Sequence, residues 1–291
     1  MSDATRRRLG DYVALVLLEL AKLGRRPLRS ASGADVKRFY EGFFEEKDQE
    51  AYRQDPRMVQ RRETIASALA GRLPPGARLL DVGCGLGDVL AGLPGPVRLY
   101  GTDLAESSLR SVRSRLGEQA RVARAAADRI PFASGSLDAC LCLEVLEHLE
   151  DDAAAARELA RVLRPGGWLV AAVPYTYYWP QYKRLMGHFR HYTRESFAAL
   201  LARAGFAVEA YLPNYPRWHQ SFTRRYAGVR VQAFLFGRLW STTSPYAYRW
   251  PWRRIGALQA ASRRLEALHA RDRALDYAAL PTSTFVLARR T

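Results

Sequence analysis

The sequence lacks any apolar run long enough to cross a membrane as a helix. A spanning helix needs about 18 consecutive apolar residues, and the most apolar stretch, residues 12–20, is shorter and contains Glu19. Basic residues 6–8 precede it as in a secretory signal, but no small-residue cleavage site follows. We therefore expect a cytoplasmic protein, whose 291 residues suffice for one large α/β core with additions.

Cysteine and lysine are both scarce. The three cysteines are Cys84, in a glycine-rich turn, and Cys140 and Cys142, which alternate within a predicted buried strand. Residues two apart on one strand are poorly placed for a disulfide, so we expect buried thiols. Nearly all basic residues are arginine, which a compositional bias explains. Such a bias does not explain why acidic residues are missing from one segment.

That segment is residues 214–275, which hold twelve basic and two acidic side chains, a net charge of +10. Residues 31–213 are nearly balanced, with 24 basic and 23 acidic side chains, and residues 1–30 add +4. The excess positive charge therefore lies in two flanking pieces. We expect an N-terminal helical extension at 1–72 and a basic, aromatic-rich helical insertion at 213–280.

From Arg78 onward, short apolar runs alternate with helical periodicity, which is typical of repeated βα units. We expect strands at 78–83, 97–102, 121–126, 137–143, 167–173, 206–212 and 282–289, and helices at 6–23, 33–46, 56–71, 86–93, 105–117, 151–163 and 193–204. The predicted fold class is α/β, a Rossmann-like, mostly parallel sheet of about seven strands with helices on both faces. Residues 73–212 plus 281–291 would form this core.

A glycine-rich turn follows the first predicted strand, in Leu79-Leu80-Asp81-Val82-Gly83-Cys84-Gly85-Leu86-Gly87. Its glycines let the backbone approach a ligand and expose amides at a predicted helix N-terminus. The spacing GxGxG differs from the GxGxxG of dinucleotide binders. The next strand ends at Asp103, which can accept hydrogen bonds from both ribose hydroxyls of an adenosine. Asp103 could also cap the helix at 105–117, and the two roles are compatible.

Five ordered motifs resemble the class I S-adenosylmethionine-dependent methyltransferases similar to the ubiquinone and menaquinone biosynthesis enzymes. They are Leu79 to Gly87, Gly101-Thr102-Asp103, Ile130-Pro131-Phe132 followed by Gly135-Ser136-Leu137-Asp138, Glu144-Val145-Leu146-Glu147-His148, and Leu163-Arg164-Pro165-Gly166-Gly167. The last motif is expected to form a structural turn between a helix and a strand. The resemblance implies S-adenosyl-L-methionine as cofactor. It does not identify the acceptor, because the family methylates quinones, sugars, lipids, polyketides and nucleic acids.

The resemblance also implies a set of cofactor contacts. They are Asp81, Gly83, Cys84, Gly85, Gly87, Asp103, Leu104, Ala127, Asp128, Leu143 and Glu144. One position departs from the family pattern, because Ala126 stands where an aspartate often contacts the adenine amino group. Either Asp128 substitutes from a shifted turn, or backbone groups near Ala127 hold the adenine.

Glu144, Glu147 and His148 follow a strand directly, at the edge where an open α/β sheet binds ligands. Two carboxylates and an imidazole could hold Mg²⁺ or another divalent cation that acidifies an acceptor hydroxyl. Relatives that methylate catechol-like quinone precursors or the terminal ribose of small RNAs use such ions. In other relatives the same letters bind no metal, the first glutamate lines the cofactor pocket and the histidine packs nearby. Both interpretations stay open.

His188 and His191 lie in Gly187-His188-Phe189-Arg190-His191-Tyr192-Thr193, where acceptor pockets of this family are usually built. Either histidine could be catalytic by removing the proton of an attacking hydroxyl, since its pKa lies near working pH. A neutral histidine could instead be a further metal ligand. The alternative is that both cap the next helix or hydrogen-bond within the loop. The aromatic residues 174–179 suit the wall of a hydrophobic pocket.

The basic insertion at 214–275 carries four of the six tryptophans and an apolar helical stripe. It could pack on the sheet, form a dimer interface or, with residues 1–30, bind an anionic membrane surface. Nucleic acid is not the expected partner, because no RNA-binding module is recognisable. We expect O-methylation of a hydrophobic or lipid-linked small molecule (a quinone, glycolipid or secondary metabolite). An RNA-modifying methyltransferase and a non-catalytic cofactor-binding scaffold are the alternatives.

Overall fold

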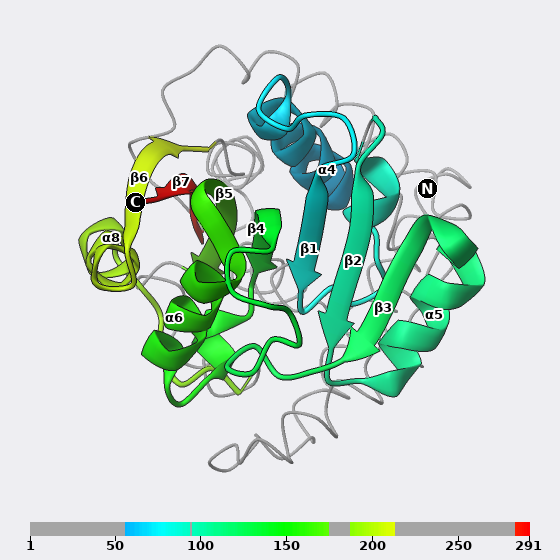
Figure 1. Ribbon diagram of the computed structural model, residues 1–291. Coiled ribbons are helices and arrows are strands. Elements are labelled where there is room, and N and C mark those ends of the chain that lie inside the picture. Colours follow the sequence, from blue (N-terminus) through cyan, green and yellow to red (C-terminus); the bar gives the residue numbers. More distant parts are fainter. Residues whose placement is uncertain (1–55, 94, 175–186, 213–282) are drawn as a thin grey trace, which may run out of the picture.

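The computed structural model describes residues 56–93, 95–174, 187–212 and 283–291 (Figure 1). The helices expected at 6–23 and 33–46, the aromatic residues 175–179 and the insertion expected at 213–280 lie outside the described residues. Every structural statement that follows concerns the described ranges.

Seven strands form one sheet in the order β3-β2-β1-β4-β5-β7-β6. They are β1 (Arg78–Val82), β2 (Arg98–Asp103), β3 (Ala120–Arg124), β4 (Leu137–Leu143), β5 (Leu163–Pro174), β6 (Phe206–Tyr211) and β7 (Ser283–Arg290). Strands β1 to β5 pair in parallel, and β7 runs antiparallel between β5 and β6. The expected mostly parallel α/β sheet is confirmed.

The strand order defines where a ligand fits. From β1 the chain moves outward to β2 and β3, then returns to place β4 and β5 on the other side of β1. The order therefore reverses between β1 and β4. In open α/β sheets, ligands bind in the crevice beyond the carboxyl ends of the strands at such a reversal. The turn after Val82, Asp103 and the turn after Leu143 all lie at this edge.

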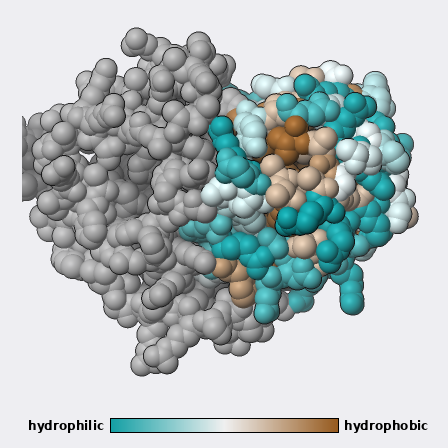
Figure 2. Space-filling view, turned by 90° about the vertical axis from the view of Figure 1, so that its left-hand side faces the viewer, coloured by the Kyte–Doolittle hydropathy of each residue, from teal (hydrophilic) through white to brown (hydrophobic). Residues whose placement is uncertain are grey.

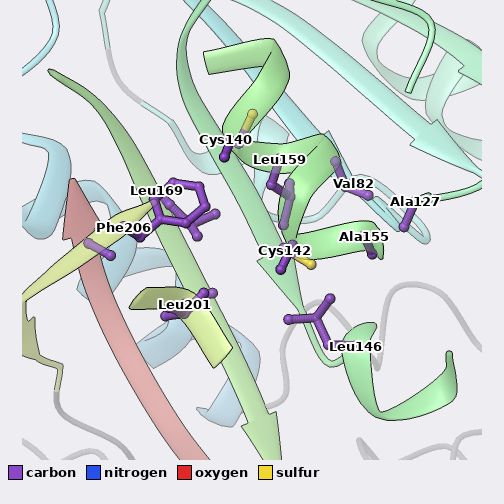
Figure 3. Packing of buried hydrophobic residues seen from close by; sticks show 14 of the residues in the cluster. Val82, Ala127, Cys140, Cys142, Leu146, Ala155, Leu159, Leu169, Leu201 and Phe206 are labelled. Atoms are coloured by element: carbon purple, nitrogen blue, oxygen red, sulfur yellow. The ribbon is translucent and has the colours of Figure 1, made fainter. Parts of the chain in front are cut away.

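Helices cover both faces of the sheet, as expected. On one face, α4 (Pro56–Leu69) and α5 (Glu106–Leu116) contribute buried side chains to a core cluster with β1 and β4. On the other face, α6 (Asp152–Val162) and α8 (Arg194–Arg203) pack against β4 and β5. Figure 3 shows Cys140 and Cys142 of β4 in this second cluster. All three cysteines are buried and unbridged, which confirms the prediction for them.

Residues 86–93 do not form the expected α-helix, and that prediction was wrong. The segment contains only a 3-10 turn, η1 (Leu90–Gly92). Gly87 has φ of 68°, in the left-handed region that a right-handed helix cannot include. The amides beside the candidate pocket therefore come from a turn, and no helix N-terminus follows it directly.

The segment Leu163 to Gly167 was expected to be a turn, but it lies within β5. Leu137 pairs with Leu163, whereas Ala139 pairs with Trp168, so β5 carries an irregularity opposite β4. The Cβ of any residue replacing Gly167 would lie 2.9 Å from the Arg164 carbonyl oxygen. The absence of a side chain at Gly167 therefore allows a bulge near the start of β5.

The outer edge of the sheet at β6 is mainly polar. Seen from the side of α8 and β6, hydrophilic residues surround a small hydrophobic area (Figure 2). Tyr211 is 42% exposed, and the Arg194 guanidinium lies over its ring, 4.6 Å from the centroid. None of the helices in the described ranges has the length and apolar character needed to cross a membrane.

Arg161 of α6 holds the loop that precedes β4. Its Nη1 donates to the Phe132 carbonyl at 2.8 Å and its Nη2 to the Ile130 carbonyl at 2.9 Å. Two further bonds join it to the Glu158 carboxylate, which accepts from the Ile130 amide at 3.0 Å. The Ile130-Pro131-Phe132 motif is therefore fixed on α6.

We predict that Arg161→Met lowers the free energy of unfolding by about 1–3 kcal/mol, because two loop carbonyls and Glu158 lose their donor. Urea denaturation of the purified protein measures this loss. The matched control is Arg157→Met on the same helix, whose exposed guanidinium lies 3.9 Å from Asp151 and should matter little. Equal losses in the two variants would contradict the assignment.

Candidate cofactor and acceptor site

The Asp103 carboxylate joins two loops at the carboxyl edge of the sheet. Its Oδ2 accepts from the Gly85 amide at 2.9 Å and its Oδ1 from the Ala105 amide at 2.8 Å. The Gly83 and Cys84 amides both donate to the Thr102 carbonyl, at 2.7 and 2.9 Å. The turn after β1 is thus bound to the end of β2, and Asp103 bonds the residue that precedes α5 rather than its first turn.

Gly83 keeps the turn close to its neighbours. It has φ of 72°, and a Cβ at this position would lie 2.4 Å from Cγ2 of Val145. A side chain would therefore be strained and would collide with the turn after β4. The far end of the loop is held by Arg115 of α5, whose guanidinium donates to Asp88 at 2.7 Å and to the Gly87 carbonyl.

Asp81, at the end of β1, is buried beneath this turn. Burial, with the nearby Asp103 charge, raises the pKa of Asp81 to about 8, against the opposing influence of Arg61. The carboxyl is therefore protonated at neutral pH in this structure. The Asp81 carboxyl is thus an ionisable group directly beneath the glycine-rich turn.

The ExxEH motif forms the 3-10 turn η3 (Leu146–His148) after β4. Leu146 is fully buried in the cluster with α6 and β4, which anchors the turn (Figure 3). Glu147 is also fully buried, and neither carboxylate oxygen has a hydrogen-bond partner among the described residues. Burial and the Glu144 charge raise the pKa of Glu147 well above its usual range. A buried, unsatisfied carboxyl is costly and calls for an explanation.

Residues 187–193 are fastened onto this turn. The Phe189 amide donates to the Glu147 carbonyl at 2.7 Å, and the Tyr192 amide donates to the Pro174 carbonyl at 2.9 Å. The Tyr192 hydroxyl donates to Asp152 at 2.8 Å, and Arg190 forms an ion pair with the same carboxylate at 2.5 Å. These contacts determine where the two histidines of the segment lie.

His188 contacts the ExxEH motif through His148, and His191 contacts His188. The rings of His148 and His188 are edge to face, with centroids 4.5 Å apart. One ligand atom from each of Glu147, His148 and His188 lies within 4.8 Å of the others. His188 Nδ1 lies 2.8 Å from His191 Nε2, so these nitrogens share a hydrogen bond. Burial lowers the pKa of His148 to about 4, which keeps it neutral.

Glu144 is not one of these three grouped residues, although its charge acts on Glu147. Its carboxylate Oε1 lies 3.1 Å from Nη2 of Arg61, on α4. Sequence reasoning missed Arg61, because nothing local distinguishes this arginine from its helical neighbours. The contact spans 83 positions of the chain, so only the folded sheet brings α4 beside the site.

The remaining expected cofactor residues surround the same edge. Ala127 is buried in the core cluster, Asp128 is exposed, and Leu104 and Leu143 are half-buried. The Arg129 amide donates to the Ala126 carbonyl at 3.1 Å, which closes the turn around Ala127. Both interpretations of the adenine contact, through Asp128 or through the backbone, remain predictions.

The reversed sheet order, the glycine-rich turn and Asp103 are features of the class I S-adenosylmethionine-dependent methyltransferases, which the chain resembles. A family model described as "Methyltransferase domain" matches residues 80–171. A solved structure from Galdieria sulphuraria, assigned as a sarcosine dimethylglycine methyltransferase, is similar in fold. Its TM-score is 0.55 at 19% identity, over 80% of this chain and 86% of that one.

Two curated relatives match part of the chain. The ubiquinone biosynthesis O-methyltransferase of Thiobacillus denitrificans is 36% identical over 101 residues, which are 32% of this chain and 43% of that protein. The 27-O-demethylrifamycin SV methyltransferase of Amycolatopsis mediterranei is 33% identical over 114 residues, 36% of this chain and 42% of that protein. The chain therefore spans less than half the length of these relatives.

The raised pKa of Asp81 predicts a pH-dependent stability. An unfolded aspartate releases its proton near pH 3.8, whereas Asp81 in the fold keeps it up to about pH 8. Between these values the folded state holds more protons, so stability falls as pH rises, by at most about 1.4 kcal/mol per pH unit from this group. Asp81→Asn stays neutral and should lose less stability between pH 5 and pH 8. Urea denaturation at each pH checks this, and parallel curves for the two proteins would contradict it.

Proposed function

We propose that this chain transfers a methyl group from S-adenosyl-L-methionine to a hydroxyl oxygen of a hydrophobic or lipid-linked small molecule. The observation that carries the proposal is the Asp103 carboxylate, which faces the glycine-rich turn at the reversal of strand order. Each of its oxygens accepts from a backbone amide at the carboxyl edge of the sheet. An acidic residue at the end of the second strand is the group that accepts from ribose hydroxyls in such sheets, and we infer this role for Asp103.

The residues around the turn fit the rest of this cofactor. The close approach of Gly83 to Val145 leaves backbone rather than side chains on the inside of the turn. Arg61 supplies a guanidinium for the amino-acid carboxylate, and its charge already acts on Asp81. When bound, the cofactor supplies a methyl group activated by the positive sulfur. The protein then needs to hold the acceptor oxygen in line with the carbon–sulfur bond.

An oxygen acceptor is supported by the hydrogen-bonded pair of His188, which is buried, and His191, which is half-buried. With Nδ1 of His188 engaged by His191, Nε2 is the nitrogen through which His188 can take the proton of an attacking hydroxyl. His191 then fixes the ring orientation and is a positioning residue. The names of the two curated relatives, both acting at oxygen, agree with this assignment. Transfer of their chemistry to this chain is part of the proposal.

The hydrophobic character of the acceptor is inferred from sequence alone. The aromatic residues 175–179 and the basic insertion at 213–280 both lie outside the described residues. A basic, tryptophan-rich helical segment suits an anionic membrane surface, where a lipid-linked acceptor would be found. We therefore propose that the insertion, with residues 1–30, brings the site to such a surface.

Cofactor binding provides the first test. Asp103→Asn keeps the shape of the side chain and removes its charge, so S-adenosyl-L-methionine should bind at least about tenfold more weakly. Isothermal titration calorimetry measures the affinity. Glu106→Gln, three residues further along, alters a carboxylate in an exposed ion pair with Arg113. It is the matched control and should bind as the unmodified protein does. Unchanged affinity in Asp103→Asn would contradict the cofactor assignment.

Glu147, His148 and His188 also fit a divalent cation, and we propose this as a second property of the site. The fit rests on the buried Glu147 carboxyl, whose oxygens have no hydrogen-bond partner among the described residues. A carboxylate with two imidazoles is a suitable donor set for Mg²⁺-like or softer divalent ions. Such an ion would acidify a bound acceptor hydroxyl, and His188 would then hold the ion instead of the proton.

Direct binding of Mn²⁺ tests this property without an acceptor. The unmodified protein should bind one Mn²⁺ per chain in an electron paramagnetic resonance titration. Glu147→Gln should weaken this binding at least about tenfold, because the only carboxylate of the cluster is lost. Glu150→Gln alters an exposed residue two positions after the turn and should have no effect. Binding that is absent from the unmodified protein, or equal in both variants, would exclude the cation site.

A further inference from the structure

The ion pair between Arg61 and Glu144 lies beside the candidate site, at the turn after β4. Arg61 comes from α4, whose position is fixed by Ile65 and Leu69 in the core. Glu144 comes from the turn after β4, and both side chains are partly buried, at 18% and 30% exposed. The pair therefore joins the helix at the edge of the site to the motif that carries Glu147.

Glu144 is held in an uncommon backbone conformation. Its φ is 56°, and among the described residues it is the one non-glycine with positive φ. Such a conformation is unfavourable for a residue with a side chain, and it persists only where the surroundings impose it. Here the Glu144 amide donates to the Ala172 carbonyl at 2.8 Å. The strained backbone therefore directs the Glu144 carboxylate to its place beside the site.

Arg61 lies within electrostatic reach of both halves of the site. Its charge acts on the pKa of Asp81, under the glycine-rich turn, and on that of Glu147, in the histidine cluster. The adenosine end of the cofactor would lie at Asp103 on β2, so its amino-acid end extends past Asp81 toward β4. The carboxylate of that end would then lie near the guanidinium with which Glu144 pairs.

We propose that Arg61 exchanges partners, so that the cofactor's carboxylate displaces Glu144 and leaves Glu144 available beside Glu147. The inference rests on the proposed function, because it requires an adenosyl amino acid in the pocket. Its consequence is an order of binding. The cofactor enters first, and the second carboxylate of the ExxEH motif becomes available to a cation or an acceptor hydroxyl only after that exchange. The two sites are then coupled, and the coupling is reciprocal.

Binding of two nucleosides distinguishes the proposed exchange of partners at Arg61 from cofactor binding without an exchange. S-adenosylhomocysteine carries the carboxylate, but its sulfur is neutral. The charge of Glu144 therefore cannot affect binding by attracting a positive sulfur. 5′-Methylthioadenosine has the same adenosine and no carboxylate. Glu144→Gln removes the competitor for Arg61 and should tighten S-adenosylhomocysteine about two- to fivefold in calorimetry. It should leave 5′-methylthioadenosine unchanged.

Arg61→Gln, alone and combined with Glu144→Gln, completes a double-mutant cycle. This variant should weaken S-adenosylhomocysteine at least about tenfold without affecting 5′-methylthioadenosine, and adding Glu144→Gln to it should produce no further tightening. Arg62→Gln, at the next position of α4, is the matched control. Arg61→Lys keeps the charge and should recover part of the affinity if the glutamine variant is unstable. Thermal unfolding of each variant identifies any loss of fold.

The outcomes distinguish the inference from the function on which it rests. If neither nucleoside binds the unmodified protein, the proposed function fails. If both bind but Glu144→Gln leaves S-adenosylhomocysteine unchanged or weaker, the exchange is overturned and the function stands. A second measurement addresses the released carboxylate: S-adenosylhomocysteine should strengthen Mn²⁺ binding more than 5′-methylthioadenosine does. Equal effects of the two nucleosides would overturn the proposed order of binding.

Discussion

The hydrogen bonds from the Gly85 and Ala105 amides to Asp103 are the constraint on which the candidate site depends. They tie the turn after β1 to the end of β2, at the point where the strand order reverses. These bonds matter because no α-helix follows the glycine-rich turn directly, since η1 is a single 3-10 turn. The same carboxylate is the group best placed to hold an adenosine ribose. Support of the loop and recognition of the cofactor thus depend on one side chain.

A second constraint is the buried carboxyl of Glu147. Its burial costs free energy that nothing among the described residues recovers through a hydrogen bond. The contact between the Phe189 amide and the Glu147 carbonyl brings the histidine-bearing segment against it, and Tyr192 and Arg190 fasten that segment to Asp152. Strain in Glu144 and burial in Glu147 occur within four residues. Such local costs are commonly found where a fold holds groups for binding or chemistry.

Much of this arrangement follows from local sequence. Alternating apolar runs placed all seven strands, and the position of Asp103 at a strand end followed from the spacing of the motifs. Two local predictions failed at glycines. The positive φ of Gly87 prevents the helix expected at 86–93, and Gly167 allows a bulge within β5 where a turn was expected. Contacts between distant segments left no sequence signal. The Arg61–Glu144 pair, and the approach of His188 to His148, depend on how α4 and the loop after β5 pack on the finished sheet.

The measurement that tests the central claim most directly follows a labelled methyl group. The purified protein is incubated with S-adenosyl-L-methionine carrying an isotopically heavy methyl and with a cell lipid extract, and both products are quantified by mass spectrometry. The account predicts a lipid-soluble compound that gains the heavy methyl in equal amount to the S-adenosylhomocysteine formed. Cofactor that binds and is never demethylated above the protein-free background, across lipid and aqueous extracts, would contradict it.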